Sequence, residues 1–127
     1  MSSWTRVTAP DVPEVPAFAH AAVAGDTIYV SGMLGLADDA SALVPGGVAA
    51  ETTQALRLVD RILAAVGGSL ADVVKVSAYM PDLAEWEAMN EAYLEAFGAH
   101  TPARITVDVD ALLFDARVEF DCIAVRR

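Results

Sequence analysis

The chain has 127 residues, and eight Lys or Arg against eighteen Asp or Glu give it a formal net charge of −10. This length allows a single domain, residues 1–127, with a core large enough to fold without disulfides or metals. A composition of 55% apolar and 20% charged residues excludes a disordered chain. One lysine and scattered arginines make no basic face, so we expect no nucleic-acid partner.

No apolar stretch reaches the ~20 residues that cross a bilayer. The N-terminal Met-Ser-Ser-Trp-Thr-Arg lacks the apolar centre of a signal peptide, so we expect a soluble cytoplasmic protein without a membrane partner. The only cysteine, Cys122, excludes an internal disulfide and is expected to be a buried, unreactive thiol. Because His20 and His100 are far apart and neither has a carboxylate at ligand spacing, we expect no metal site.

The N-terminal third of the chain predicts a loop and a hairpin. Three prolines make residues 8–20 an extended loop. Residues 21–24 and 27–33 predict the two strands of a β-hairpin around a Gly-Asp turn. Ser31 and Gly32 end the second strand, where a glycine allows another group to approach the backbone closely.

The middle of the chain predicts two helices around a strand. Apolar residues at steps of three and four predict a helix over 48–66, ended by two glycines. Strict alternation predicts a strand over 74–80. Asp82 and Glu85 have capping-box spacing for a second helix, residues 83–97, which carries Asn90 on its packed side.

Alternating segments at 103–110 and 117–125 predict two final strands. The order of elements predicts an α+β fold with a single mixed β-sheet and two helices packed on one face. This order is two or three strands, a helix, a strand, a helix and two strands. The other face of the sheet keeps Tyr79, Ile123 and Val125 among polar groups. A half-apolar open face is usually covered by another subunit, so we infer a symmetric homo-oligomer.

The sequence has no phosphate-binding glycine motif, GxSxG or HExxH. Two charged residues remain as candidates for chemistry. Arg104 follows Thr101-Pro102-Ala103, so the loop that Pro102 fixes places it at the start of a predicted strand. It is either a surface arginine paired with Asp108 or Asp121, or a fixed fork for a planar anion such as a carboxylate. Glu119 faces away from the core in mid-strand, where a solvated or salt-bridged residue is the simpler interpretation.

Five segments together carry a family resemblance from about residue 15 to 127. They are Val30-Ser31-Gly32, residues 70–76 (Leu-Ala-Asp-Val-Val-Lys-Val), residues 89–93 (Met-Asn-Glu-Ala-Tyr), Pro102-Ala103-Arg104 and residues 118–124 (Val-Glu-Phe-Asp-Cys-Ile-Ala). In this order they resemble the Rid (YjgF, reactive-intermediate deaminase) family. The most specific part is Pro-Ala-Arg followed at this distance by Val-Glu-x-x-x-Ile-Ala.

This resemblance implies a chorismate-mutase-like, YjgF-type fold in a homotrimer with a barrel-like centre and clefts between subunits. It implies hydrolysis of 2-imino acids and enamines to 2-keto acids and ammonia without a cofactor. By the match, Arg104 would bind the substrate carboxylate and Glu119 would position the attacking water. The residues implied to shape the pocket are Phe18, Ser31, Gly32, Asn90 and the backbone at Thr106.

The chain departs from the family pattern around the implied pocket. Pro16-Ala17-Phe18 replaces Gly-Pro-Tyr, which removes a hydroxyl, and Met33 and His20 replace glutamines. A more apolar mouth would favour a bulkier or less polar substrate side chain. Two other functions stay open: a non-catalytic trimer that binds a carboxylate metabolite, and the endoribonuclease activity attributed to some relatives, against which the acidic charge argues.

Overall fold

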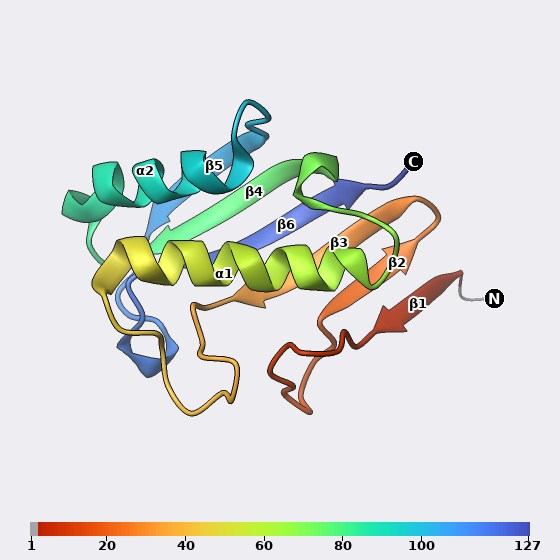
Figure 1. Ribbon diagram of the computed structural model, residues 1–127, viewed down its shortest axis with the longest axis horizontal. Helices are drawn as coiled ribbons and strands as arrows, with labels where there is room; N and C mark the ends of the chain where they lie inside the picture. The colour runs from red at the N-terminus through yellow and green to blue at the C-terminus, as the bar shows by residue number, and fades with distance from the viewer. Residues whose placement is uncertain (1–2) are drawn as a thin grey trace.

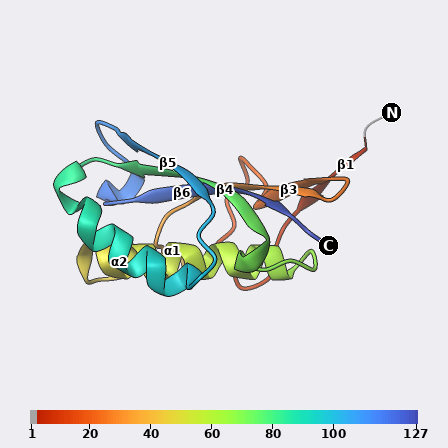
Figure 2. The same cartoon turned by 90° about the horizontal axis from the view of Figure 1, so that it is seen from above.

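The computed structural model describes residues 3–127 as two layers, a six-stranded sheet with two helices on one of its faces (Figure 1; Figure 2). The expectation for the N-terminus includes Met1 and Ser2, which lie outside the described residues. The α+β class with a mixed sheet is confirmed. The elements are β1 (Trp4–Val7), β2 (Ala21–Ala24), β3 (Thr27–Met33), α1 (Gly47–Ala64), β4 (Val73–Met80), α2 (Trp86–Phe97), β5 (Ala103–Asp108) and β6 (Glu119–Val125).

The strand order in the sheet is β1-β2-β3-β6-β4-β5. Strands β4 and β5 are parallel, because α2 crosses over between them, and every other neighbouring pair is antiparallel. The last strand of the chain, β6, therefore lies between β3 and β4 (Figure 1). Glu119, at the start of β6, stands opposite Tyr79 of β4.

The second helix begins later than predicted. Leu83–Glu85 form a 3₁₀ turn, and α2 starts only at Trp86. Asp82 caps this turn by accepting a hydrogen bond from the Ala84 N–H at 2.9 Å. The predicted capping box is wrong in its second half, because the Glu85 carboxylate accepts a 2.6 Å hydrogen bond from Nε of Arg117 instead.

Both C-terminal strands are shorter than predicted, since β5 ends at Asp108 and β6 begins at Glu119. Between these strands lies the turn Leu113–Asp115, in which Phe114 and Asp115 have φ 59°. A residue with positive φ cannot be part of an extended strand, so the strands end before this turn and begin after it. At the other end of the chain β1 supplies the third N-terminal strand that the sequence left open. Three of its four residues are exposed, so it carries almost no alternation signal.

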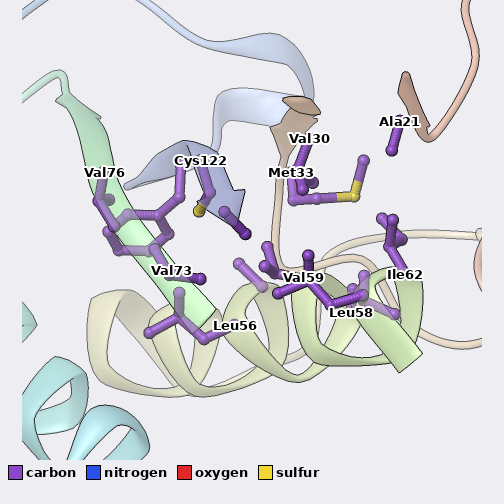
Figure 3. Close-up of a cluster of buried hydrophobic side chains, with 14 of the residues drawn as sticks. Ala21, Val30, Met33, Leu56, Leu58, Val59, Ile62, Val73, Val76 and Cys122 are labelled. Carbon is purple, nitrogen blue, oxygen red and sulfur yellow. The ribbon is translucent and has the colours of Figure 1, made fainter. Parts of the chain in front are cut away.

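The core lies between the sheet and α1, where side chains of the helix meet those of β3, β4 and β6 (Figure 3). Leu56, Val59 and Ile62 are fully buried, as their helical spacing predicts. Burial of each such side chain contributes about 1.5–3 kcal/mol. Cys122 is buried among them, and this burial raises the pKa of its thiol to about 12, which confirms the expectation of an unreactive cysteine.

The opposite face of the sheet carries no helix (Figure 2). On it Tyr29 and Ile105 are each 50% exposed and Val125 is 43% exposed. The apolar open face that the alternation predicts is therefore present. Among residues 3–127, no helix has the length and apolar character needed to cross a membrane.

Candidate functional site

The candidate residues are divided between two pockets. Arg104 and Asn90 line a cavity of about 280 Å³, here called the Arg104 pocket. Phe18, Gly32 and Glu119 line a second cavity of about 180 Å³, here called the Glu119 pocket. In residues 3–127, no three His, Cys, Asp or Glu side chains gather as a metal site would require.

Strand β5 directs Arg104 toward α2, because Arg104 stands opposite the fully buried Val76 of β4. Its Nη2 donates a 2.7 Å hydrogen bond to Oδ1 of Asn90. Its guanidinium carbon lies 4.7 Å from the ring centroid of Tyr93, within cation–π range. Its Nη1 donates to Sδ of Met89 at 3.8 Å. These contacts fix the plane of the guanidinium and use only some of its five N–H donors.

Neither carboxylate considered from the sequence pairs with Arg104. Asp121 instead accepts a 2.7 Å hydrogen bond from the Tyr79 hydroxyl, and Asp108 lies at the far end of β5. Among residues 3–127 no carboxylate lies within salt-bridge distance of Arg104. A positive charge held in place without an anionic partner is suited to bind a ligand carboxylate.

Tyr93 is a site residue to which the sequence gave no role, although it lies in the predicted second helix and in the segment 89–93 that carries the resemblance. It is 4% exposed and packs on Phe97 at a centroid distance of 4.7 Å. Burial raises its pKa to about 12, so the ring under Arg104 stays a neutral phenol. The available signal was its spacing from Asn90, since residues three apart share a helix face.

Glu119 projects from the face of the sheet opposite the helices, because its neighbours Val118 and Phe120 are both fully buried. Its carboxyl group is half-buried, and this burial raises its pKa; nearby Asp121 raises it further. Gly32 packs directly against this carboxylate, and a Cβ on Gly32 would overlap Oε2 of Glu119. The expected close approach at this glycine is confirmed.

The loop that carries Phe18 is held by buried hydrogen bonds. His20, 2% exposed, accepts at Nδ1 from the Ala9 N–H and donates from Nε2 to the Pro13 carbonyl, both at 2.9 Å. The Ser31 hydroxyl donates to the Ala19 carbonyl at 2.6 Å. Ser31 thus ties down the loop; it lines neither of these two pockets, and its implied part in shaping a cleft between subunits stays a prediction.

Thr106 also lines neither pocket. It stands opposite the buried Ala78, two residues beyond Arg104 on the same side of β5. Its role in shaping the site, which the resemblance assigned to its backbone, therefore stays a prediction.

Glu51 is a buried acid that the sequence analysis did not identify. It lies on α1, is 4% exposed, and its Oε1 accepts a 2.8 Å hydrogen bond from the Arg117 N–H. Burial raises the pKa of Glu51. Because Arg117 is also bound to Glu85, the chain is anchored two residues before Glu119. Glu51 and Arg117 are 66 residues apart in the sequence, so no local pattern could indicate their contact.

Known proteins resemble this chain over most of its length. A protein-family model described as Endoribonuclease L-PSP matches residues 9–126. A rat protein named 2-iminobutanoate/2-iminopropanoate deaminase is 38% identical over 112 residues, which cover 88% of this chain and 82% of the rat protein.

Solved structures show the same fold. The yeast protein YEO7 has a TM-score of 0.92 at 30% identity, with 98% of this chain and 99% of the yeast chain covered. The structure of E. coli TdcF with bound serine has a TM-score of 0.89 at 25% identity, with 97% and 99% of the two chains covered.

Proposed function

Since the chain belongs to the Endoribonuclease L-PSP family, the Rid family of the sequence resemblance, we propose that it hydrolyses 2-imino acids to 2-keto acids and ammonia. The observation that carries this proposal is Arg104, which is fixed by Asn90 and Tyr93 and has no carboxylate partner in residues 3–127. Relatives named 2-iminobutanoate/2-iminopropanoate deaminase support the reaction. TdcF, whose structure contains serine, supports an amino-acid-like ligand.

Arg104 binds the carboxylate group of the substrate. Two parallel N–H groups of a guanidinium match the two oxygens of a carboxylate, which sets both position and orientation. The Asn90 amide and the Tyr93 ring hold the fork before substrate arrives, so little conformational freedom is lost on binding. The imine carbon, one bond from the carboxylate, is placed by the same contact.

Glu119 directs the water. The water oxygen forms a bond to the imine carbon while one water proton passes to the Glu119 carboxylate, and the C=N electron pair moves onto nitrogen, which takes that proton back from Glu119. In the resulting carbinolamine the hydroxyl proton is transferred through Glu119 to the nitrogen, the C–N bond breaks, and ammonia departs, leaving the keto acid and an ionised Glu119 behind. An imine carbon is already electrophilic, so orientation and a water-directing carboxylate suffice for a useful rate.

The proposed active form is a homotrimer whose clefts lie between subunits. Two features support it: Arg104 and Glu119 occupy separate pockets in one chain, and the open face of the sheet exposes Tyr29, Ile105 and Val125. In this assembly Arg104 of one copy and Glu119 of the next face the same substrate. Covering the open face also removes its apolar side chains from water.

The family description alone would favour cleavage of RNA. A chain with a net charge of −10 repels phosphate, and several arginines are bound within the chain: Arg61 to Asp38, Arg117 to Glu85, and Arg126 to the Val66 carbonyl. The electrostatics therefore favour a small carboxylate over a polyanion. Binding of a carboxylate metabolite without turnover is the alternative that experiment must separate from catalysis.

An imine-trapping assay tests the proposed function. An amino-acid oxidase generates imines from alanine, leucine and phenylalanine, and semicarbazide traps what remains. The wild-type chain is expected to lower semicarbazone formation, whereas Arg104→Ala is expected to leave it at the level without protein. Equal trapping with and without the wild-type trimer, for every imine, would overturn the proposal and leave a carboxylate-binding protein.

A further inference from the structure

The Glu119 pocket is lined almost wholly by apolar side chains. Glu119 is the one charged residue among those that line its about 180 Å³. The other lining residues come from the loop after β1, the end of β3 and the segment that follows it, and the turn before β6, together with the buried Leu58 of α1. Leu58 and Met33, two of these residues, also belong to the buried cluster that Figure 3 shows.

The walls of this pocket exist before any ligand binds. His20 and Ser31 hold the loop that supplies Val15 and Phe18. Arg61 adds a third tie, a 3.0 Å hydrogen bond from Nη1 to the Asp11 carbonyl. A cavity held open by hydrogen bonds around it binds an apolar group without first having to form.

The rim of the pocket exposes apolar surface to water. Leu113 is 74% exposed and Phe114 is 57% exposed, and both lie in the turn Leu113–Asp115. Phe114 has φ 59°, an uncommon conformation for an aromatic residue. A strained turn that presents two large apolar side chains at a cavity indicates a binding role, because neither residue supports the core.

The position of the pocket relates it to the substrate. In the proposed reaction Glu119 directs water to the imine carbon, and the substrate side chain is attached to that same carbon. The group beside Glu119 is therefore the side chain, one bond from the reacting atom. An apolar cavity of about 150 Å³ holds benzene, so the size found here admits an isobutyl or benzyl group.

We propose that the Glu119 pocket receives the substrate side chain and selects imines with apolar side chains of leucine or phenylalanine size over the methyl group of the alanine-derived imine. This inference rests on the proposed function. Each methylene group accommodated in a hydrophobic pocket is worth about tenfold or more in kcat/KM. The expected ratio of kcat/KM for the leucine-derived to the alanine-derived imine is therefore at least about tenfold.

The test uses the same trapping assay with three imines and a matched pair of variants. Leu113 and Leu83 each begin an exposed 3₁₀ turn, but only Leu113 lines the Glu119 pocket. Leu113→Ala is expected to lower the ratio of kcat/KM for the leucine and phenylalanine imines to kcat/KM for the alanine imine by about tenfold. Leu83→Ala is the control and is expected to retain the wild-type preference.

A second variant tests the wall formed by the loop. Phe18→Tyr adds a hydroxyl group at the pocket and is expected to reduce the preference for apolar side chains. A wild-type protein that hydrolyses the alanine imine as well as the others would overturn the inference while leaving the proposed function intact. An unchanged preference in both Leu113→Ala and Phe18→Tyr would place the side chain elsewhere. No hydrolysis of any imine would overturn both.

Discussion

Arg104 and Glu119 project from opposite faces of the same sheet. Arg104 is in register with the buried Val76 and faces α2, whereas Glu119 is in register with Tyr79 and faces the side without helices. This placement supports the proposed site between subunits, in which the two side chains come from different copies of the chain. Two different surfaces that meet repeatedly around an axis close into a ring, which is the arrangement a trimer requires.

Mixing two inactive variants tests this arrangement. In trimers refolded from equal amounts of Arg104→Ala and Glu119→Gln chains, about a quarter of the interfaces combine an intact Arg104 with an intact Glu119. We expect about a quarter of the wild-type rate from the mixture, although each variant alone is inactive. Activity no higher than that of the separate variants would show that the site does not form between subunits.

Replacing Arg104 by lysine tests the carboxylate fork. Arg104→Lys keeps the charge but loses the paired N–H donors, and we expect affinity for a 2-keto acid to fall about 10–100-fold, since each charge-assisted hydrogen bond is worth about 1.5–3 kcal/mol. Titration calorimetry at fixed salt measures this change. Arg57→Lys is the control, because Arg57 is bound to Gln54 in another part of the surface. Wild-type affinity in Arg104→Lys would contradict the assignment.

Replacing Glu119 by glutamine separates catalysis from binding. The amide has the same shape but cannot take a proton from water, so we expect kcat to fall by about 10²–10⁴. Affinity for the 2-keto acid stays near the wild-type value, because Arg104 provides that contact. Kinetics of imine hydrolysis and titration calorimetry on the same preparation check both halves. A loss of binding with unchanged kcat would reverse the two roles.

The pH dependence of the rate reports the ionisation of Glu119. Burial and then Asp121 raise its pKa, so activity is expected to be lost, as pH falls, at a higher pH than an ordinary glutamate would give. Asp121→Asn removes one cause of this shift and is expected to move the acid limb of kcat/KM to lower pH. An acid limb that does not move in Asp121→Asn would mean that another group controls it.

Glu51 is expected to make stability depend on pH. Burial raises its pKa in the folded chain, so the folded state holds this proton more tightly than the unfolded state. Ionisation therefore lowers stability as pH rises from the ordinary glutamate pKa to the raised value. Glu51→Gln cannot ionise, and its free energy of unfolding is expected to increase relative to wild type across that interval.

Urea denaturation at several pH values, at one protein concentration, measures this difference. Glu51→Ala serves as the comparison, since it leaves the Arg117 N–H without its acceptor and is expected to lose about 1–3 kcal/mol at every pH. A wild-type chain that gains stability over Glu51→Gln as pH rises would show that ionised Glu51 is favourable in the fold.

Local spacing in the sequence was enough to predict both helices and every strand except β1, with their buried faces, although not all of their ends. Leu56, Val59 and Ile62 repeat at helical intervals, and Glu119 alternates with Val118 and Phe120. Burial of one face gives a helix a period of about 3.6 residues and a strand a period of about two. The segments around Arg104 and Glu119 also sufficed to identify the family. These features depend on neighbours only a few residues away.

The tertiary structure decided which of these residues meet. It placed Tyr93 under Arg104, bound the Ser31 hydroxyl to the Ala19 carbonyl, and bound Glu51 to Arg117. Each contact depends on strand order, above all on β6 entering between β3 and β4. That order follows from packing the whole chain at once, which no local period records. For the same reason the resemblance could imply that Arg104 and Glu119 share a cleft between subunits, and only the sheet revealed that within one chain they face opposite sides.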